Sequence, residues 1–111
     1  ALENKEVIKW PVLGINMLNV TDTSMLYRYG ILVDKDIKEG VVVVDTTDGS
    51  GAKQAGLKKG DVITALAGKK VKDIAYLRYE LYQHNAGDRV EITYIRDGKE
   101  KKADVVLGSS E

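Results

Sequence analysis

The last part of the chain carries the clearest structural signal in the sequence, a predicted two-stranded hairpin. Apolar residues recur at every second position over residues 90–94 and again at Ala103, Val105 and Leu107, and a period of two is typical of strands with one buried face. Between them stands Asp97-Gly98, a dipeptide that favours the type I′ turn joining two antiparallel strands. A fold that accommodates this hairpin contains an antiparallel sheet.

The remainder of the chain predicts short elements that do not repeat as β-α-β units. Apolar runs next to glycine or proline predict three more strands, over residues 12–18, 41–44 and 61–66. Residues that commonly begin helices predict three short helices, over residues 24–29, 52–55 and 74–83. We therefore expect an α+β, mainly β domain: a partly open antiparallel barrel or sandwich of five to six strands, capped by two to three helices.

Two of the predicted strands have expected positions in the sheet. Pro11 and Gly14 both weaken pairing inside a central strand, so the strand over residues 12–18 is expected at an edge. The run from Val41 to Val44 consists of four β-branched residues without polar alternation. Such a run is typical of a strand that is covered on both faces.

Charge and cysteine content exclude several classes of function. The chain of 111 residues has 17 basic and 17 acidic residues, whereas domains that bind nucleic acid or membrane surfaces commonly carry a basic surplus. It has no cysteine, which excludes disulfides, zinc–thiolate sites and thiol catalysis. No apolar run approaches the roughly 20 residues that span a bilayer. The length fits one domain.

Three segments resemble catalytic or ligand-binding signatures but lack essential residues. Gly51 and Gly56 have P-loop spacing, yet Leu57 and Lys58 stand where Lys and Ser or Thr are needed. The calcium-loop-like segment 34–45 places Lys and Glu where an oxygen ligand and a glycine are required. The single histidine has no recognisable nucleophile and orienting group around it. We expect no catalytic residue, metal site or cofactor.

What remains is the architecture of a binding site. An edge strand that begins with Leu13, Gly14 and Ile15 offers unpaired N–H groups, and successive N–H groups can hold a carboxylate. A helix with an apolar stripe could form the opposite wall, so that an extended peptide adds as a further strand. Hydrophobic patterning alone favours a core role for Leu13, Ile15, Met17 and Leu81.

A series of motifs has the order and spacing of a known family. The motifs are Val12-Leu13-Gly14-Ile15, Ala52-x-x-Ala55-Gly56-Leu57-x-x-Gly60-Asp61-Val62-Ile63, Leu77-x-x-x-Leu81, Gly87-Asp88 and Val90-x-Ile92-x-Tyr94-x-Arg96-x-Gly98. From Pro11 to Leu107 they resemble the PDZ domains of HtrA/DegP-type (trypsin-like) serine proteases, of the Gram-positive bacterial type. The first motif resembles the carboxylate-binding loop of that family.

The resemblance implies a domain organisation and a setting. Residues 11–107 would form the PDZ domain, residues 1–10 a linker to a preceding protease domain, and residues 108–111 a C-terminal tail. The fragment itself would not be an enzyme, because it lacks a catalytic triad, whereas the parent protein would be an HtrA-like serine endopeptidase. Its location would be extracytoplasmic, at the cell surface or in the periplasm, with a membrane anchor in the parent.

The resemblance also implies a function in protein quality control, namely capture of C-termini or exposed hydrophobic segments of unfolded or substrate proteins. The backbone amides of Leu13, Gly14 and Ile15 would hold the terminal carboxylate. The groove and its pocket would be formed by Leu13, Ile15, Asn16, Met17, Ile74, Arg78 and Leu81. No cofactor is implied; the partners would be such peptide segments and the parent's protease domain.

Individual groove residues have implied roles. Asn16 would pair with the peptide backbone, and Leu77 would face the core. Ile74 stands where animal PDZ domains that select Ser or Thr carry His, which implies a preference for apolar peptide residues. Arg78 could attract an acidic peptide residue or remain solvated.

Other interpretations of the same residues remain open. The module could belong to a C-terminal processing peptidase, a site-2 protease or a secretion component, because relatives of these share the pattern. It could also be a structural interaction domain whose groove is closed by its own Trp10 or tail. A small hydrolase that uses His84 is the weakest alternative.

Overall fold

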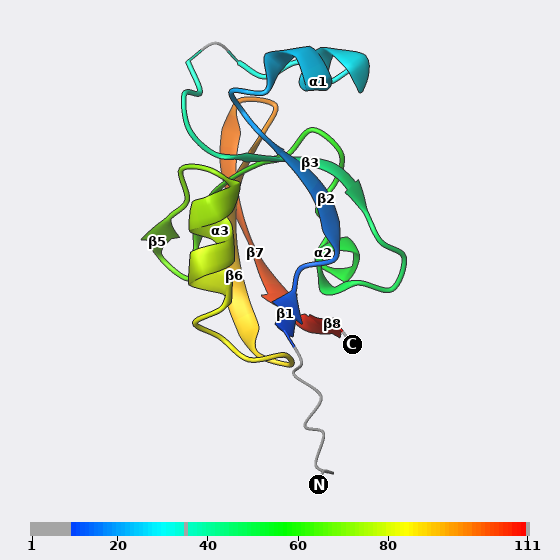
Figure 1. Cartoon of the computed structure of the whole chain (residues 1–111), viewed down its shortest axis with the longest axis vertical. Coiled ribbons are helices and arrows are strands. Elements are labelled where there is room, and N and C mark those ends of the chain that lie inside the picture. Colours follow the sequence, from blue (N-terminus) through cyan, green and yellow to red (C-terminus); the bar gives the residue numbers. More distant parts are fainter. Residues whose placement is uncertain (1–9, 35, 111) are drawn as a thin grey trace, which may run out of the picture.

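Eight strands and three helices make up the computed structural model, which describes residues 10–34 and 36–110 (Figure 1). The strands are β1 (Trp10–Val12), β2 (Ile15–Asn19), β3 (Val41–Thr46), β4 (Val62–Leu66), β5 (Lys69–Lys70), β6 (Arg89–Arg96), β7 (Lys99–Val106) and β8 (Gly108–Ser110). The helices are α1 (Thr23–Arg28), α2 (Gly51–Gln54) and α3 (Ile74–Leu81). Within the described residues, no helix is long and apolar enough to cross a membrane.

The main sheet is antiparallel and open, with β2 and β7 at its edges. Its order is β2-β3-β4-β6-β7, and β5 pairs with β4 beside this path. β1 and β8 form a separate two-stranded ladder. The predicted mainly β, antiparallel α+β fold is therefore confirmed, as is the edge position of the strand predicted over residues 12–18, although Leu13 and Gly14 divide that strand into β1 and β2.

The C-terminal hairpin forms as its sequence predicts. β6 and β7 pair along their full length, and the last pair, Arg96 and Lys99, encloses a two-residue turn. Both turn residues have positive φ, 53° at Asp97 and 77° at Gly98, which is the backbone conformation of a type I′ turn.

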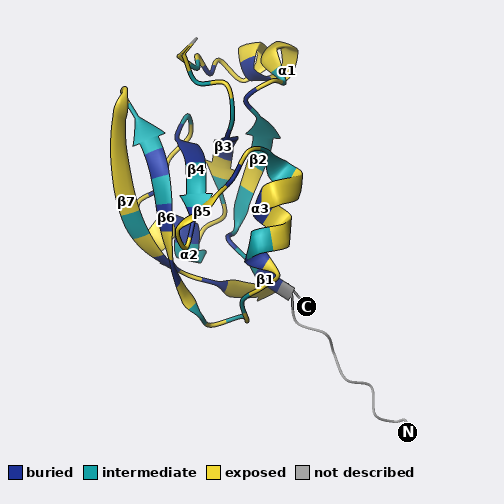
Figure 2. Ribbon diagram, turned by 90° about the vertical axis from the view of Figure 1, so that its left-hand side faces the viewer, coloured by how far each residue is buried: buried dark blue, intermediate teal, exposed yellow. Residues whose placement is uncertain are grey.

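The four valines of β3 divide between the two faces of the sheet. Val41 and Val43 belong to a core cluster that includes Leu77 of α3, whereas Val42 and Val44 belong to a second cluster that includes Leu26 of α1. All four are buried, so the predicted cover on both faces is confirmed. Figure 2 shows α3 lying beside β2, with the buried residues mostly on the strands between the two edges of the sheet.

α3 begins at its predicted residue because a local side chain satisfies one of its first N–H groups, whereas α1 and α2 begin one residue before the predicted positions. Asp73 precedes α3 and its carboxylate accepts from the Tyr76 N–H at 3.0 Å. α3 ends at Leu81, two residues before the predicted end at residue 83. The Gln83 and His84 N–H groups bond three residues back, to Glu80 and Leu81, so the chain continues as a tighter turn after the α-helix has ended.

A buried ion pair holds the connection between α2 and β4. The Asp61 side chain accepts from Arg96 Nε at 2.8 Å, from Arg96 Nη2 at 2.6 Å and from the Lys58 N–H at 2.8 Å. Arg96 also donates to the Gly56 carbonyl, and its hydrogen bond with Asp61 raises the pKa of the guanidinium. β6 is thereby linked to both ends of this connection.

The ends of the domain differ from expectation. The sequence predicts a tail over residues 108–111, whereas Gly108–Ser110 form β8 and pair with Trp10–Val12, which includes one residue of the expected linker. The pairing is made by backbone groups. It does not require alternating apolar residues, so the serine-rich segment carries no pattern that predicts a strand. Residues 1–9 of the expected linker lie outside the described residues, as does Glu111.

Candidate functional site

β2 has a free edge, one with which no strand of the described residues pairs, on the side of the sheet where α3 lies. One edge of β2 pairs with β3, and β2 is the last strand of the sheet on that side. Ile15 and Met17 of β2 are half-buried and pack on the same core cluster as Leu77 and Leu81 of α3. The strand and the helix therefore form the two sides of one apolar surface.

The backbone of β2 alternates between its two edges. The Gly14 carbonyl accepts from the Thr47 N–H at 2.8 Å, and the Val20 N–H donates to the Gly40 carbonyl at 3.3 Å, so both residues turn backbone groups toward the β3 side. Because successive residues of an antiparallel strand alternate, Ile15 and Met17 turn their N–H and carbonyl groups to the free edge.

The loop before β2 turns two successive N–H groups outward. The Leu13 carbonyl accepts from the Ala52 N–H at 3.2 Å and the Gly14 carbonyl from the Thr47 N–H, so both carbonyls point toward α2 and β3. In a trans peptide the N–H points opposite to the carbonyl, and no cis bond occurs among the described residues. The Gly14 and Ile15 N–H groups therefore point away from α2 and β3, an arrangement that suits an anion.

Only glycine fits at position 14. Its φ is +80°, and a Cβ atom there would lie 2.2 Å from the Ser50 Cβ. Ser50 is the N-cap of α2, and its Oγ accepts from the Lys53 N–H at 3.2 Å. The start of α2 therefore supports the loop directly.

The charged side chains near this support pair with each other. Lys53 Nζ lies 2.6 Å from Asp48 Oδ1, and both side chains are exposed. Their hydrogen bond lowers the pKa of Asp48 and raises that of Lys53. The nearby lysine is thus paired with its own partner, and the outward backbone N–H groups of the loop are its candidate anion-binding feature.

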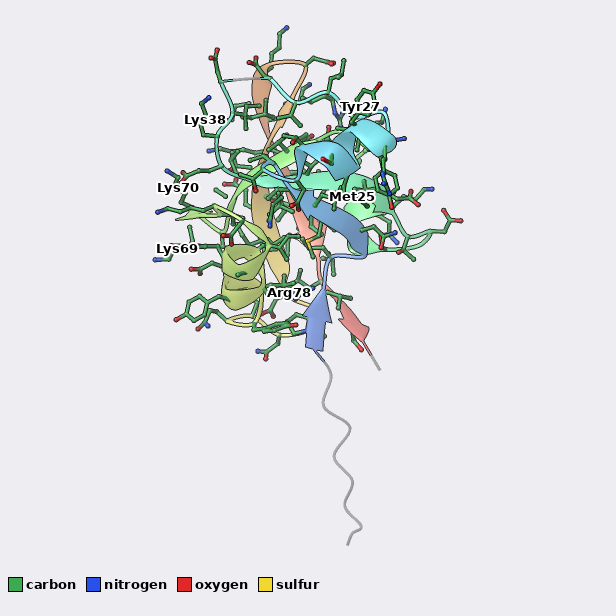
Figure 3. The ribbon with its side chains drawn as sticks, turned by 45° about the horizontal axis from the view of Figure 1, so that its top comes forward. Met25, Tyr27, Lys38, Lys69, Lys70 and Arg78 are labelled. Atoms are coloured by element: carbon green, nitrogen blue, oxygen red, sulfur yellow. The ribbon has the colours of Figure 1, made fainter. Side chains whose placement is uncertain are left out.

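The structure brings most of the predicted site residues together. Leu13 and Leu81 are 3% and 5% exposed and lie within the main core cluster, which agrees with the core role that patterning favours. Ile15, Met17 and Ile74 are half-buried against that cluster, whereas Asn16 and Arg78 are exposed. Figure 3 shows Arg78 on α3. Leu77 is fully buried, as expected.

One residue at this site was not anticipated from the sequence. Asn19, the last residue of β2, accepts a hydrogen bond through Oδ1 from the Ile74 N–H at 2.7 Å. The two residues are 55 positions apart, and the predicted strand stopped at residue 18. An asparagine at the end of a strand was the only local signal.

A second apolar surface surrounds α1, at the far end of the molecule from the Gly14 loop (Figures 1 and 3). Tyr27 and Leu32 are 81% and 91% exposed, and Met25 is also exposed. Tyr27 and Leu32 border a hollow of about 630 Å³ whose lining also includes Leu26 and Ile31. Exposed apolar surface of this kind commonly marks a contact with another protein.

Comparison with known protein families agrees with this geometry. Residues 11–107 match the family model described as PDZ domain. The chain therefore belongs to the PDZ domain family.

The curated relatives identify the type of PDZ domain. The chain is 39% identical over 109 residues to the serine protease Do-like HtrA of Lactococcus lactis subsp. lactis, covering 98% of the chain and 27% of the relative. It is 40% identical over 109 residues to the serine protease HtrA-like of Staphylococcus aureus strain USA300, covering 96% of the chain and 14% of the relative. The chain thus spans less than a third of these relatives' length, and the predicted kinship with HtrA proteases of Gram-positive bacteria is confirmed.

Solved structures share the fold. The HtrA-type protease AlgW with a decapeptide superposes with a TM-score of 0.78 at 19% identity, covering 99% of this chain and 32% of that chain. The HtrA3 PDZ domain bound to a phage-derived ligand, FGRWV, superposes with a TM-score of 0.71 at 16% identity, covering 93% and 89%. At these identities the likeness concerns the fold.

Proposed function

We propose that the chain is a peptide-binding module of an HtrA-like serine protease. It captures C-termini or exposed hydrophobic segments of substrate proteins by strand addition, and so recruits substrate to the protease or regulates it. The observation that carries this proposal is the free edge of β2, preceded by a loop whose Gly14 and Ile15 N–H groups point outward. The related proteins support it, since AlgW and the HtrA3 PDZ domain were both solved with peptides.

The geometry defines how a peptide would bind. A peptide added to β2 pairs with the backbone of Ile15 and Met17, and its carboxylate meets the N–H groups of the Leu13–Ile15 loop. Asn16 turns its backbone toward Asp45 of β3, so its exposed side chain is its means of reaching a peptide. The final apolar side chain packs against Ile15 and Met17.

The opposite wall supplies side chains for the upstream residues. Ile74 is half-buried at the start of α3 and favours an apolar peptide residue. Arg78 is exposed one turn later and attracts an acidic residue. An exposed pair of this kind contributes little, so we expect an effect on affinity below about fivefold.

The setting of the parent protein is part of the same proposal. By its homology with HtrA proteases, the whole protein is a serine endopeptidase, and this chain is a part of it that performs no catalysis. We place it outside the cytoplasm, anchored to the membrane and acting in protein quality control. The support is the similarity to HtrA proteases over 96–98% of this chain.

The decisive experiment compares a peptide with a free and with an amidated C-terminus. The probe is FGRWV, titrated while backbone amide chemical shifts are recorded. The free acid is expected to shift residues 13–19 and α3, and amidation to weaken binding at least about tenfold, because charge-assisted hydrogen bonds to the carboxylate are lost. Equal binding of the two forms would exclude the loop as a carboxylate site.

Two neighbouring variants test the strand face. Met17 and Leu18 are both half-buried but belong to opposite clusters of the core. Met17→Lys is expected to weaken the free acid about tenfold, because a charge enters the apolar surface that receives the peptide side chain. Leu18→Lys is the matched control and should leave the affinity within about twofold. Equal losses would place the binding surface elsewhere.

A further inference from the structure

We propose that Asn19 is a positioning residue that sets the spacing between β2 and α3 and thereby the affinity for the upstream part of a peptide. This inference rests on the proposed peptide-binding function. Asn19 is the last residue of β2 and Ile74 the first of α3, and the 2.7 Å hydrogen bond from the Ile74 N–H to Asn19 Oδ1 joins them. One side chain thus connects the binding strand to the opposite wall.

Asn19 is firmly held at its own end. Its N–H donates to Asp22 Oδ2 at 3.0 Å, and the Asp22 N–H donates to the Asn19 carbonyl at 3.0 Å. Its register partner in β3 is Val41, which is fully buried. Because strand residues alternate, its side chain lies on the same face as Ile15 and Met17. The acceptor is therefore fixed relative to the sheet.

The segment that leads into α3 is tied to one strand after another. The Val71 N–H donates to the Thr64 carbonyl of β4 at 2.9 Å. The Lys72 carbonyl accepts from the Gly40 N–H, just before β3, at 2.8 Å. The Asn19 bond completes the series at β2. Hydrogen bonds thereby connect the segment before α3 to β4, to the residue before β3 and to β2. The bond to β2 determines the distance between the start of α3 and the free edge.

The two ends of the site depend on Asn19 differently. A peptide that pairs with β2 in the antiparallel sense has its C-terminus at Gly14 and its upstream residues beside Asn19 and Ile74. Loss of the Asn19 acceptor leaves the partly buried Ile74 N–H unpaired and releases the start of α3 from β2. Contacts with upstream residues weaken, whereas the carboxylate loop, supported by α2, is unchanged.

Ile74→Pro removes the other partner of this bond. Proline lacks the N–H and is favoured at the first position of a helix. Asp73 before it has φ −157° and ψ −175°, the extended conformation that a residue before proline adopts. The variant is thus expected to fold, and the effect of Asn19→Ala can be measured with and without the donor.

The test measures affinities for FGRWV and for its last three residues, N-acetylated. Asn19→Ala is expected to weaken the pentapeptide about tenfold and the tripeptide less than about twofold, with the ratio between free and amidated pentapeptide unchanged. Asn19→Asp keeps an acceptor at the helix start and should restore binding to within about threefold. In the Ile74→Pro background, Asn19→Ala should change the affinity less than about twofold. Asn85→Ala, at an exposed asparagine outside both β2 and α3, is the control.

The outcomes separate the two proposals. If the wild-type chain binds free and amidated peptide alike, the capture of C-termini in the proposed function fails. If it discriminates between them, the role of Asn19 is refuted when Asn19→Ala weakens both peptides equally, when Asn19→Asp gives no recovery, or when the loss persists with Pro at position 74. If Asn19→Ala does not fold, Asn19→Ser takes its place. The role of Asn19 is then refuted when Asn19→Ser weakens both peptides equally or when Asn19→Asp binds no more tightly than Asn19→Ser.

Discussion

The contact between Gly14 and Ser50 predicts a strong energetic coupling between two residues on different elements. In Gly14→Ala, the positive φ costs about 1–2 kcal/mol. Reduced freedom of the unfolded chain offsets about 0.4–1 kcal/mol of this. The new Cβ would lie 2.2 Å from the Ser50 Cβ, and relief of such overpacking costs a further 1–3 kcal/mol or so. The free energy of unfolding should therefore fall by about 2–4 kcal/mol.

Ser50→Gly removes the obstructing atom. Alone it should cost at most about 1 kcal/mol, because glycine is an acceptable N-cap. The double variant should lose about 1–2 kcal/mol, less than the sum of the single losses, since the steric overlap is gone and only the backbone strain and the altered N-cap remain. Gly68→Ala is the control for strain, since its φ is also +80° and nothing lies within 4 Å. Urea unfolding followed by circular dichroism measures all four, and additive losses would refute the steric account.

The remaining predictions concern two ion pairs. Asp61→Ala should lower the free energy of unfolding by about 2–4 kcal/mol, because it leaves the partly exposed Arg96 without its carboxylate; a loss no larger than that of the exposed Asp104→Ala would contradict this. Lys70 donates to Glu39 across 2.8 Å and lowers the pKa of Glu39 from 4.5. Its stabilising effect is therefore present above the ordinary pKa and lost as pH falls through the lowered one. The difference in Tm between wild type and Lys70→Met should thus be small at neutral pH and vanish in acid. A difference in Tm that grows in acid would contradict this pH dependence.

Elements defined by local chemistry could be predicted from the sequence. Asp97-Gly98 supplies the two positive φ angles of its turn, and Asp73 caps the first turn of α3. By contrast, β8 could not be predicted, because Gly108–Ser110 pair through the backbone with residues at the other end of the chain. Short strands of this kind carry no hydrophobic period.

The candidate site likewise has features that local sequence predicts and features that it does not. The loop at Gly14 was anticipated, since glycine and its apolar neighbours form a continuous motif. The burial of Leu13 and Leu81 follows from contacts between segments far apart in the chain, and patterning alone favoured it without placing the two together. The bond between Asn19 and Ile74 had no local signal beyond an asparagine, because its two partners lie 55 positions apart.

The ladder of β1 and β8 has a mechanical consequence. Trp10 pairs with Ser110 and Val12 with Gly108, so both ends of the domain leave from the same point (Figure 1). Tension that draws these two ends apart opens the ladder one pair at a time instead of shearing all pairs together. Pro11 adds no N–H to resist it. The next residue along the chain after β1 is Leu13, so tension applied at Trp10 reaches the Gly14 loop before it reaches β2.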